Sequence, residues 1–192
     1  MSLVCDKRNL AFVHIPGTSG TNLAYHLERA GFYRIEDKVH LLASEIPDKY
    51  TKFTIIRDPW DREITSYHHV KNNIQEHLIN TFYINKFDSS TFENFIKSKY
   101  IECKDVRSRY MTSSLSTLSY YIDTECRVLR YENLEQDYSK LAEEYDLPTD
   151  ALKTRINNNP RTEETYWTEE LKEIVLPFIQ KDLERYYTNA CM

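Results

Sequence analysis

The sequence predicts an α/β fold, a three-layer sandwich built around a mainly parallel sheet. Three short apolar runs have the length and composition of buried strands. Each run leads through a turn into a segment whose apolar residues recur at helical spacing. Because strands alternate with helices, parallel pairing with helices packed on the sheet is expected. The length fits one domain, and we expect residues 1–192 to form it.

The first strand–loop–helix unit lies near the N-terminus. Leu10–Ile15 is an apolar run that ends at Pro16 and predicts a buried strand. A loop over Pro16–Gly20 is followed by a predicted helix over Thr21–Ala30, which Gly31 ends. Small loop residues allow close backbone approach to a ligand, and the N–H groups at a helix start bind anions. The loop is therefore a candidate phosphate site, and an ordinary tight turn with a capped helix is the alternative.

The second unit begins with Lys52–Ile56, a predicted strand that Pro59 closes because the residue before a proline is extended. Asp61 is placed to cap a helix that runs to about Lys71. Arg57 follows the strand directly, at the edge where open α/β sheets bind ligands.

Thr65 lies two turns into this helix, where its hydroxyl and the Arg57 guanidinium could bind one phosphate. The alternatives are an ion pair of Arg57 with Asp58 or Asp61, and a Thr65 hydroxyl bonded to its own helix backbone.

The rest of the chain continues the alternation. A helix is expected over Thr91–Tyr100 with Ser89 and Ser90 as caps, a strand over Arg127–Tyr131, and a helix over Asn133–Tyr145. Thr168 is expected to cap a final helix, with Glu169 and Glu170 in its first turn, and Pro177 is expected to kink it.

Composition excludes several classes of protein. A net charge of −5 argues against nucleic-acid binding. The cysteines form no CxxC pair, which argues against a metal site. A Cys103–Cys126 bridge stays open, although reduced thiols are favoured in a cytosolic protein. With neither a signal peptide nor ~20 consecutive apolar residues, no membrane association is expected, and the cytoplasm is the expected location.

Two segments resemble the sulfotransferase family that uses 3′-phosphoadenosine 5′-phosphosulfate (PAPS), most closely its carbohydrate-modifying branch. That branch has a strand followed by HIPKTGGTS, and His14–Asn22 here reads HIPGTSGTN. The family's second motif is Arg, Asp or Asn, Pro, an aromatic residue, an acid and Arg, with Ser eight residues after the first Arg. Here Arg57–Arg62 reads RDPWDR, and Thr65 takes the Ser position. Weaker likeness around Leu129–Leu134 and before the final helix extends the resemblance over most of the chain.

The resemblance implies a P-loop-like nucleotide-binding architecture. The loop would bind the 5′-phosphosulfate and the second motif the 3′-phosphate of PAPS, with PAP as the product and no metal. Trp60 could stack on adenine or pack in the core. The predicted nucleotide-binding residues are Gly17, Thr18, Ser19, Gly20, Thr21, Asn22, Arg57, Thr65 and Arg161, the last of these also readable as a solvated loop residue.

One departure from the family concerns charge. The family's loop lysine falls at Gly17, and a cation there would stabilise negative charge on the leaving oxygen. Losing such a group costs about 2–4 kcal/mol of barrier in comparable sites. Arg62, Lys38 and Lys71 are the candidates to replace it.

In-line sulfuryl transfer benefits from a base with a pKa near neutrality, which histidine provides. His40 is the first choice because related enzymes often carry a histidine in this region. His68 and His69, after the second motif, are the alternatives, and His14 is expected to be structural.

The predicted function is thus transfer of a sulfuryl group from PAPS to the hydroxyl or amine of a small-molecule or carbohydrate acceptor. The alternatives are a non-catalytic PAP- or PAPS-binding module that has lost the loop lysine, and a nucleotide kinase, against which the missing P-loop lysine argues. If the chain is an excised domain, the Golgi lumen replaces the cytoplasm. The sequence does not predict the acceptor or the oligomeric state.

Overall fold

The computed structural model describes residues 1–192 except 36–39, 77–86, 103–116, 123–124, 153–165 and 188–192. The chain divides into two compact units. The first unit comprises Met1–Arg57 and Leu118–Asn159, and the second comprises Asp58–Thr117 and Pro160–Met192. The expectation that residues 1–192 form one domain stays a prediction.

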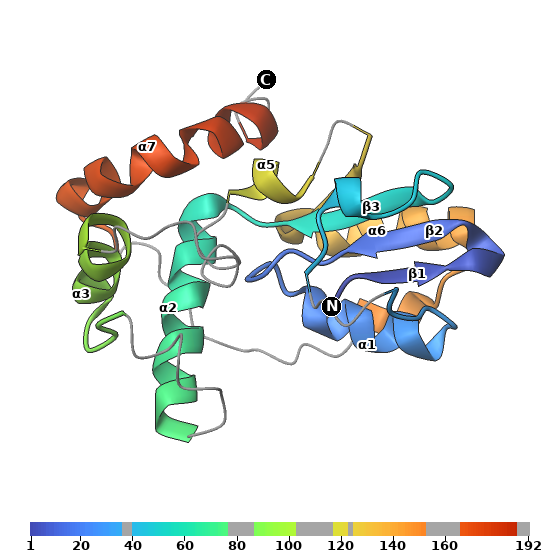
Figure 1. The fold of residues 1–192 in the computed structure, drawn as a ribbon, viewed down its shortest axis with the longest axis horizontal. Coiled ribbons are helices and arrows are strands. Elements are labelled where there is room, and N and C mark those ends of the chain that lie inside the picture. The colour runs from blue at the N-terminus through green and yellow to red at the C-terminus, as the bar shows by residue number, and fades with distance from the viewer. Residues whose placement is uncertain (36–39, 77–86, 103–116, 123–124, 153–165, 188–192) are drawn as a thin grey trace. The chain divides into compact units, whose positions relative to one another are not determined.

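The first unit contains a four-stranded sheet in the order β1 (Leu3–Cys5), β2 (Leu10–Val13), β3 (Thr51–Ile56), β4 (Arg127–Arg130) (Figure 1). β2, β3 and β4 are parallel, whereas β1 runs antiparallel to its neighbour β2. The predicted α/β class and mainly parallel sheet are confirmed. β1 was not predicted, because three apolar residues are too few to show a strand period.

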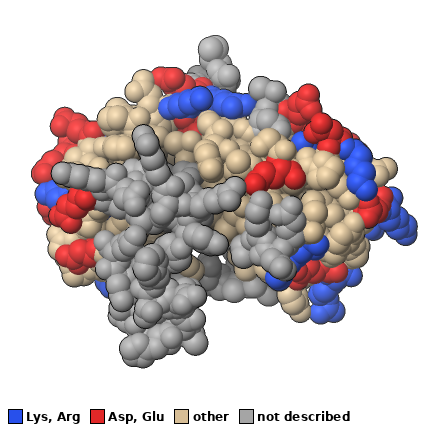
Figure 2. Space-filling model, viewed as in Figure 1, with Lys and Arg blue, Asp and Glu red and all other residues tan. Residues whose placement is uncertain are grey.

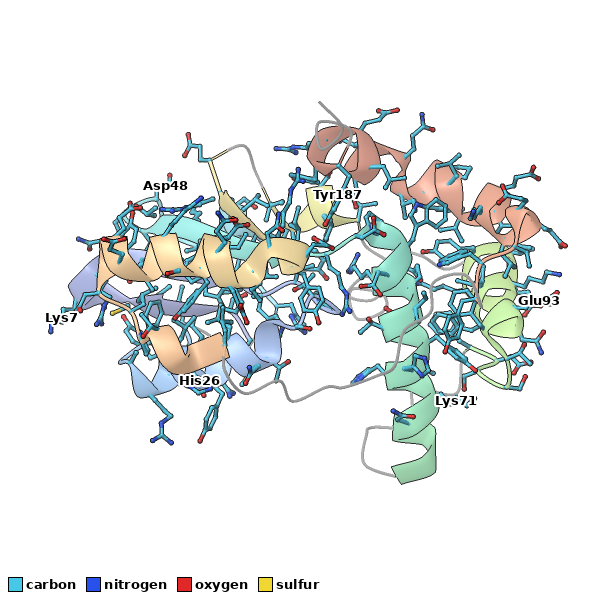
Figure 3. All side chains as sticks on the ribbon, turned by 180° about the vertical axis from the view of Figure 1, so that it is seen from behind. Lys7, His26, Asp48, Lys71, Glu93 and Tyr187 are labelled. Carbon is cyan, nitrogen blue, oxygen red and sulfur yellow. The ribbon has the colours of Figure 1, made fainter. Side chains whose placement is uncertain are left out.

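Two helices cover one face of this sheet. Phe12, Phe53 and Leu129 share a core cluster with Leu27 of α1 (Gly20–Arg29) and Leu141 of α6 (Leu134–Tyr145). In the view from behind, α6 lies over the face of the sheet (Figure 3).

Alternate strand residues point to the opposite face. Ala11, Val13, Thr54 and Ile56 are fully buried there, so the sheet is covered on both faces. The same unit contains the short helix α5 (Leu118–Tyr121).

The second unit is helical in its described part. It contains α2 (Pro59–Glu76), α3 (Phe92–Lys97) with a π-helical turn over Ser98–Glu102, and α7 (Glu169–Tyr186). Their apolar faces form one cluster, whose buried members are Ile64, Tyr67, Phe87, Phe92, Phe95, Ile96, Leu171, Val175 and Ile179.

A fully buried ion pair lies within this second unit. The Nζ atom of Lys99, on the π-helical turn, is 2.5 Å from Oε2 of Glu63 on α2. The side chains are 0% and 4% exposed. Burial lowers the pKa of Lys99.

Three predicted helix caps can be compared with the structure. Asp58, rather than Asp61, begins α2, because its Oδ1 accepts hydrogen bonds from the backbone N–H groups of residues 60 and 61. Pro59 then takes the first helical position, which its missing N–H suits. Thr91, rather than Ser89 or Ser90, caps α3 by accepting from the N–H of Asn94. The prediction that Thr168 caps the last helix is confirmed.

Two further findings concern the apolar character of the helices and the charges on the surface. In the described ranges, no helix is long and apolar enough to cross a membrane. Acidic and basic side chains are interspersed on the described surface seen in Figure 2.

Candidate functional site

The carboxyl ends of three parallel strands bring the predicted motifs of the first unit together. Val13 of β2 pairs with Thr54 of β3, and Ile56 of β3 pairs with Arg130 of β4. The glycine-containing loop therefore follows β2, and Arg57 follows β3, at one edge of the sheet. At this edge Nη1 of Arg57 donates a hydrogen bond to the carbonyl oxygen of Gly17 at 3.4 Å.

The loop itself is a tight turn with unusual backbone angles. Gly17 has φ 80° and Ser19 has φ 67°, both in the left-handed region that favours glycine. The hydroxyl of Thr18, which is fully buried, donates to the Ile15 carbonyl at 2.8 Å. That hydroxyl therefore closes the turn, and the nucleotide-binding role of Thr18 stays a prediction.

The loop is followed directly by α1. The first N–H groups of this helix have no carbonyl partner within the helix. In the described part of the chain, the side chain of the N-cap residue Ser19 accepts no hydrogen bond from these groups. Together with the helix dipole, this geometry suits an anion.

Gly20, the first residue of α1, lies against His14, the residue that follows β2. A Cβ atom at residue 20 would lie 2.4 Å from Cδ2 of His14 and 2.8 Å from its Nε2. Only glycine fits here without a shift of the loop or the ring. His14 is buried, and burial lowers its pKa well below the usual value, so its ring is neutral at pH 7.

His40 is half-buried beside His14, with 4.9 Å between the ring centroids. Its Nδ1 atom is 2.9 Å from the His14 carbonyl oxygen. A carbonyl oxygen only accepts hydrogen bonds, so Nδ1 carries the proton and Nε2 holds the basic lone pair in the neutral ring. The structure thus fixes the tautomer of the histidine that the sequence ranks first as base.

Arg57 is fully buried, and its contacts explain its placement. Besides the Gly17 carbonyl, the guanidinium carbon lies 4.2 Å from the ring centroid of Tyr131, the residue that follows β4. The sequence did not single out Tyr131. Strand register could have identified it. Ile56 pairs with Arg130, so Arg57 and Tyr131, which follow the two strands directly, are neighbours.

The remaining candidates on α2 belong to the second unit. The Thr65 hydroxyl donates to the Asp61 carbonyl at 3.1 Å, which is the backbone role weighed against phosphate binding. His68 Nε2 lies 3.0 Å from the Tyr166 hydroxyl, and burial, followed by the charge of Lys71, lowers the His68 pKa. His69 is exposed. The roles of Thr65, His68 and His69 in a site stay predictions.

The candidate cations and the adenine platform are also on α2 or outside the described residues. Arg62 is buried, and the Nζ atom of Lys71 lies 3.0 Å from the Tyr67 hydroxyl. Trp60 packs edge-on against Trp167, with 4.8 Å between ring centroids, consistent with the core role. Lys38, Cys103 and Arg161 lie outside the described residues.

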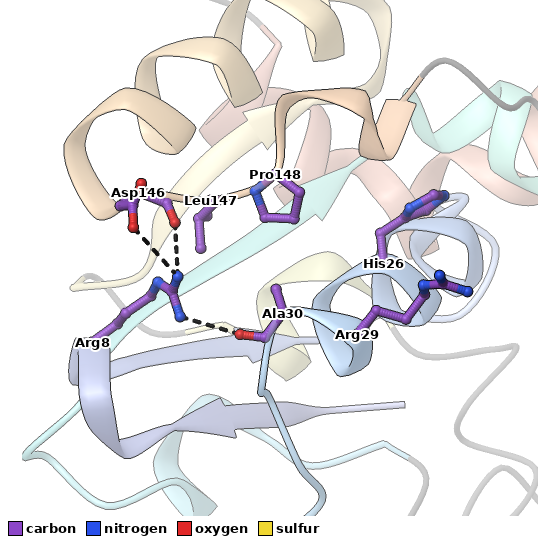
Figure 4. Close-up of a pocket in the computed structure, with 7 residues that line it drawn as sticks. All are labelled: Arg8, His26, Arg29, Ala30, Asp146, Leu147 and Pro148. Atoms are coloured by element: carbon purple, nitrogen blue, oxygen red, sulfur yellow. Dashed lines mark hydrogen bonds and ion pairs between the residues drawn. The ribbon is translucent and has the colours of Figure 1, made fainter.

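A cleft of about 430 Å³ lies at the opposite, amino end of β2 (Figure 4). Arg8 occupies it, and its guanidinium donates to the carbonyl oxygens of Tyr145 at 2.9 Å, Ala30 at 3.1 Å and Asp146 at 2.8 Å. These carbonyl groups lie at the C-termini of α6 and α1, so Arg8 satisfies hydrogen-bond acceptors at the ends of both helices. The cleft is lined by Arg8, His26, Arg29, Ala30, Asp146, Leu147 and Pro148, none of which is a predicted site residue.

The fold is of the α/β class, and it brings the glycine-containing loop and Arg57 together at the carboxyl edge of its sheet, where open α/β sheets bind ligands. The family model described as "Sulfotransferase family" matches residues 1–189. The chain therefore belongs to the sulfotransferase family. Comparison with curated proteins found no match, and comparison with solved structures found none. In the described residues, no group of three or more His, Cys, Asp or Glu side chains could hold a metal ion.

Proposed function

We propose that this protein transfers a sulfuryl group from PAPS to the hydroxyl of a carbohydrate or small-molecule acceptor. One observation carries the proposal: the loop after β2 and Arg57 after β3 meet at one sheet edge, through the Arg57–Gly17 hydrogen bond. The α1 N-terminus supplies N–H donors for the 5′-phosphosulfate, and Arg57 supplies a guanidinium for the 3′-phosphate. Membership of the sulfotransferase family supports the assignment of sulfuryl transfer to this edge of the sheet.

His40 is the proposed base. Its Nε2 accepts the proton of the acceptor hydroxyl while the acceptor oxygen forms a bond to sulfur. The bond between sulfur and the bridging oxygen breaks, and its electron pair leaves with PAP. The His14 carbonyl holds the required tautomer through Nδ1–H. His40 contacts His14, which packs against the first residue of α1, so the base lies beside the proposed phosphosulfate loop.

A second candidate function is a PAP- or PAPS-binding module without transfer activity. Gly17 favours it, because the family lysine is absent and a side chain at φ 80° would be strained by about 1–2 kcal/mol. Sulfuryl transfer from PAPS to a panel of sugar acceptors separates the two functions. Transfer supports the enzyme, whereas PAP binding without transfer to any acceptor supports the module.

Calorimetric titration with PAP, AMP and ATP tests the nucleotide site that both functions share. We expect micromolar PAP binding, with AMP and ATP at least tenfold weaker. Arg57→Ala should remove the preference for PAP over AMP, because a buried charge-assisted contact to the 3′-phosphate is lost. An exposed cation of the same unit, Arg29, provides the matched control Arg29→Ala. A wild-type protein that binds PAP no better than AMP would contradict both functions.

A further inference from the structure

We infer that Tyr131 is a positioning residue that holds the Arg57 guanidinium in the orientation that binds the 3′-phosphate. The inference rests on the proposed function and deepens it. It begins with the register of the sheet: β3 and β4 run parallel, and Ile56 pairs with Arg130. Arg57 and Tyr131 are the next residues on the two strands, so their side chains leave the sheet edge as neighbours.

The contact between these side chains has the geometry of a cation–π interaction. The guanidinium carbon lies 4.2 Å from the centroid of the Tyr131 ring, well within the 6 Å range in which such contacts stabilise a cation. Another described arginine–tyrosine pair of this unit, Arg29 with Tyr25, has a separation of 5.7 Å. Arg57 is fully buried whereas Tyr25 is 52% exposed, so the Arg57 contact is the stronger of the two.

The ring also fixes where the edge of the guanidinium points. A guanidinium carries its N–H donors in one plane, and an aromatic face fixes the orientation of that plane. With Tyr131 against the group, Nη1 reaches the Gly17 carbonyl at 3.4 Å. One side chain thus links the end of β3 to the phosphosulfate loop. An aromatic ring orients the guanidinium without adding a formal negative charge that would repel a phosphate.

Removing the ring should therefore affect one part of nucleotide binding. The guanidinium would gain rotamer freedom, and ordering it on a phosphate would then cost affinity. PAP carries the 3′-phosphate and AMP does not, so the ratio of the two affinities reports the orientation of Arg57. A structural defect in Tyr131 variants would lower both affinities together.

The test compares PAP and AMP affinities of wild type, Tyr131→Leu and Tyr131→Phe by calorimetry. Leucine keeps apolar volume against the core cluster on which Tyr131 packs, and phenylalanine keeps the ring. We expect Tyr131→Leu to weaken PAP about tenfold with AMP unchanged, and Tyr131→Phe to stay within about twofold of wild type. Tyr25→Leu, which removes the exposed arginine–tyrosine contact, is the matched control and should leave the ratio unchanged.

The outcomes separate this inference from the proposed function. If wild type prefers PAP and Tyr131→Leu keeps that preference, the positioning role is overturned and the sulfotransferase site stands. If wild type does not prefer PAP, the proposed function fails and the positioning role fails with it.

A second measurement detects the contact without a ligand. A proton held over an aromatic face resonates upfield, so the Arg57 Hε signal in an arginine-labelled sample should be shifted in wild type and Tyr131→Phe. It should return to an ordinary position in Tyr131→Leu. An unshifted Arg57 signal in wild type overturns the inference even where Tyr131→Leu does not fold.

Discussion

The two ends of the sheet in the first unit use polar groups in opposite ways. At the carboxyl end of the strands, α1 begins at Gly20 and directs backbone N–H groups toward the proposed ligand. At the amino end, α1 and α6 finish, and Arg8 binds their last carbonyl groups. The same helix thus presents donors at one end and has its acceptors satisfied at the other. We infer that the carboxyl end is built for binding and the amino end for stability.

The largest expected effect is on stability, from Arg8→Ala at the amino end. The substitution removes three charge-assisted hydrogen bonds to carbonyl oxygens, each between 2.8 and 3.1 Å. We expect the free energy of unfolding to fall by about 3 kcal/mol, measured by urea denaturation. The affinity for PAP of the folded variant should not change.

Arg8→Lys is the control for this prediction. A lysine ammonium cannot match the planar fork that spans two helix ends, so it should recover only part of the loss. If the Arg8→Ala variant were as stable as wild type, the stabilising role inferred for the amino end would be contradicted.

The next largest effect is expected from Gly20→Ala at the carboxyl end. The new methyl group would lie 2.4 Å from Cδ2 of His14, so the loop or the histidine must move. We expect a loss of about 2–3 kcal/mol in the free energy of unfolding, together with weaker PAP binding by calorimetry. The combined loss of stability and binding would distinguish this end from the Arg8 end.

Gly31→Ala is the matched control, because Gly31 also needs a special backbone but has open space around it. Its φ is 90°, and apart from Gly31 itself and its two neighbours in the chain, no heavy atom lies within 4 Å of the position that an alanine methyl group would take. Only backbone strain of about 1 kcal/mol is expected, with PAP binding intact. Equal effects of the two substitutions would show that the contact with His14 is unimportant.

The smallest effect concerns pH. Burial depresses the pKa of His14 in the folded state, so below about pH 6.5 the unfolded chain binds a proton that the folded chain does not. The contribution of His14 to stability, taken as the difference between wild type and a His14 variant, should be full above this pH and fall by about 1 kcal/mol between pH 6.5 and 5.5. Urea denaturation of wild type and His14→Asn across pH 5–8 measures the free energy of unfolding of each protein and so this difference. Identical slopes for the two proteins would contradict the prediction.

Much of the fold could be predicted because strand and helix periods are local signals. Leu10 and Arg127 begin strands as predicted, and Thr168 caps the last helix. The start of α2 was missed because Asp58 and Asp61 are both plausible caps, and only the hydrogen bonds to Asp58 decide between them.

The candidate site was predicted as two motifs that share one nucleotide, without the side-chain contacts that hold their residues in place. That Arg57 ends a strand could be read from the sequence, but its contact with Tyr131 could not, because the two residues lie far apart in the chain and meet through strand register. The proton position on His40 also depends on a carbonyl distant in sequence, that of His14. Local patterns carry no information on such pairings.

The buried pair of Glu63 and Lys99 in the second unit constrains how the sequence can change over evolution. Replacing either residue alone would leave one charge in the interior without its partner, which is strongly unfavourable. Replacing both with apolar residues of similar volume can preserve the fold. Positions 63 and 99 are therefore expected to differ together between relatives, as an inherited pair.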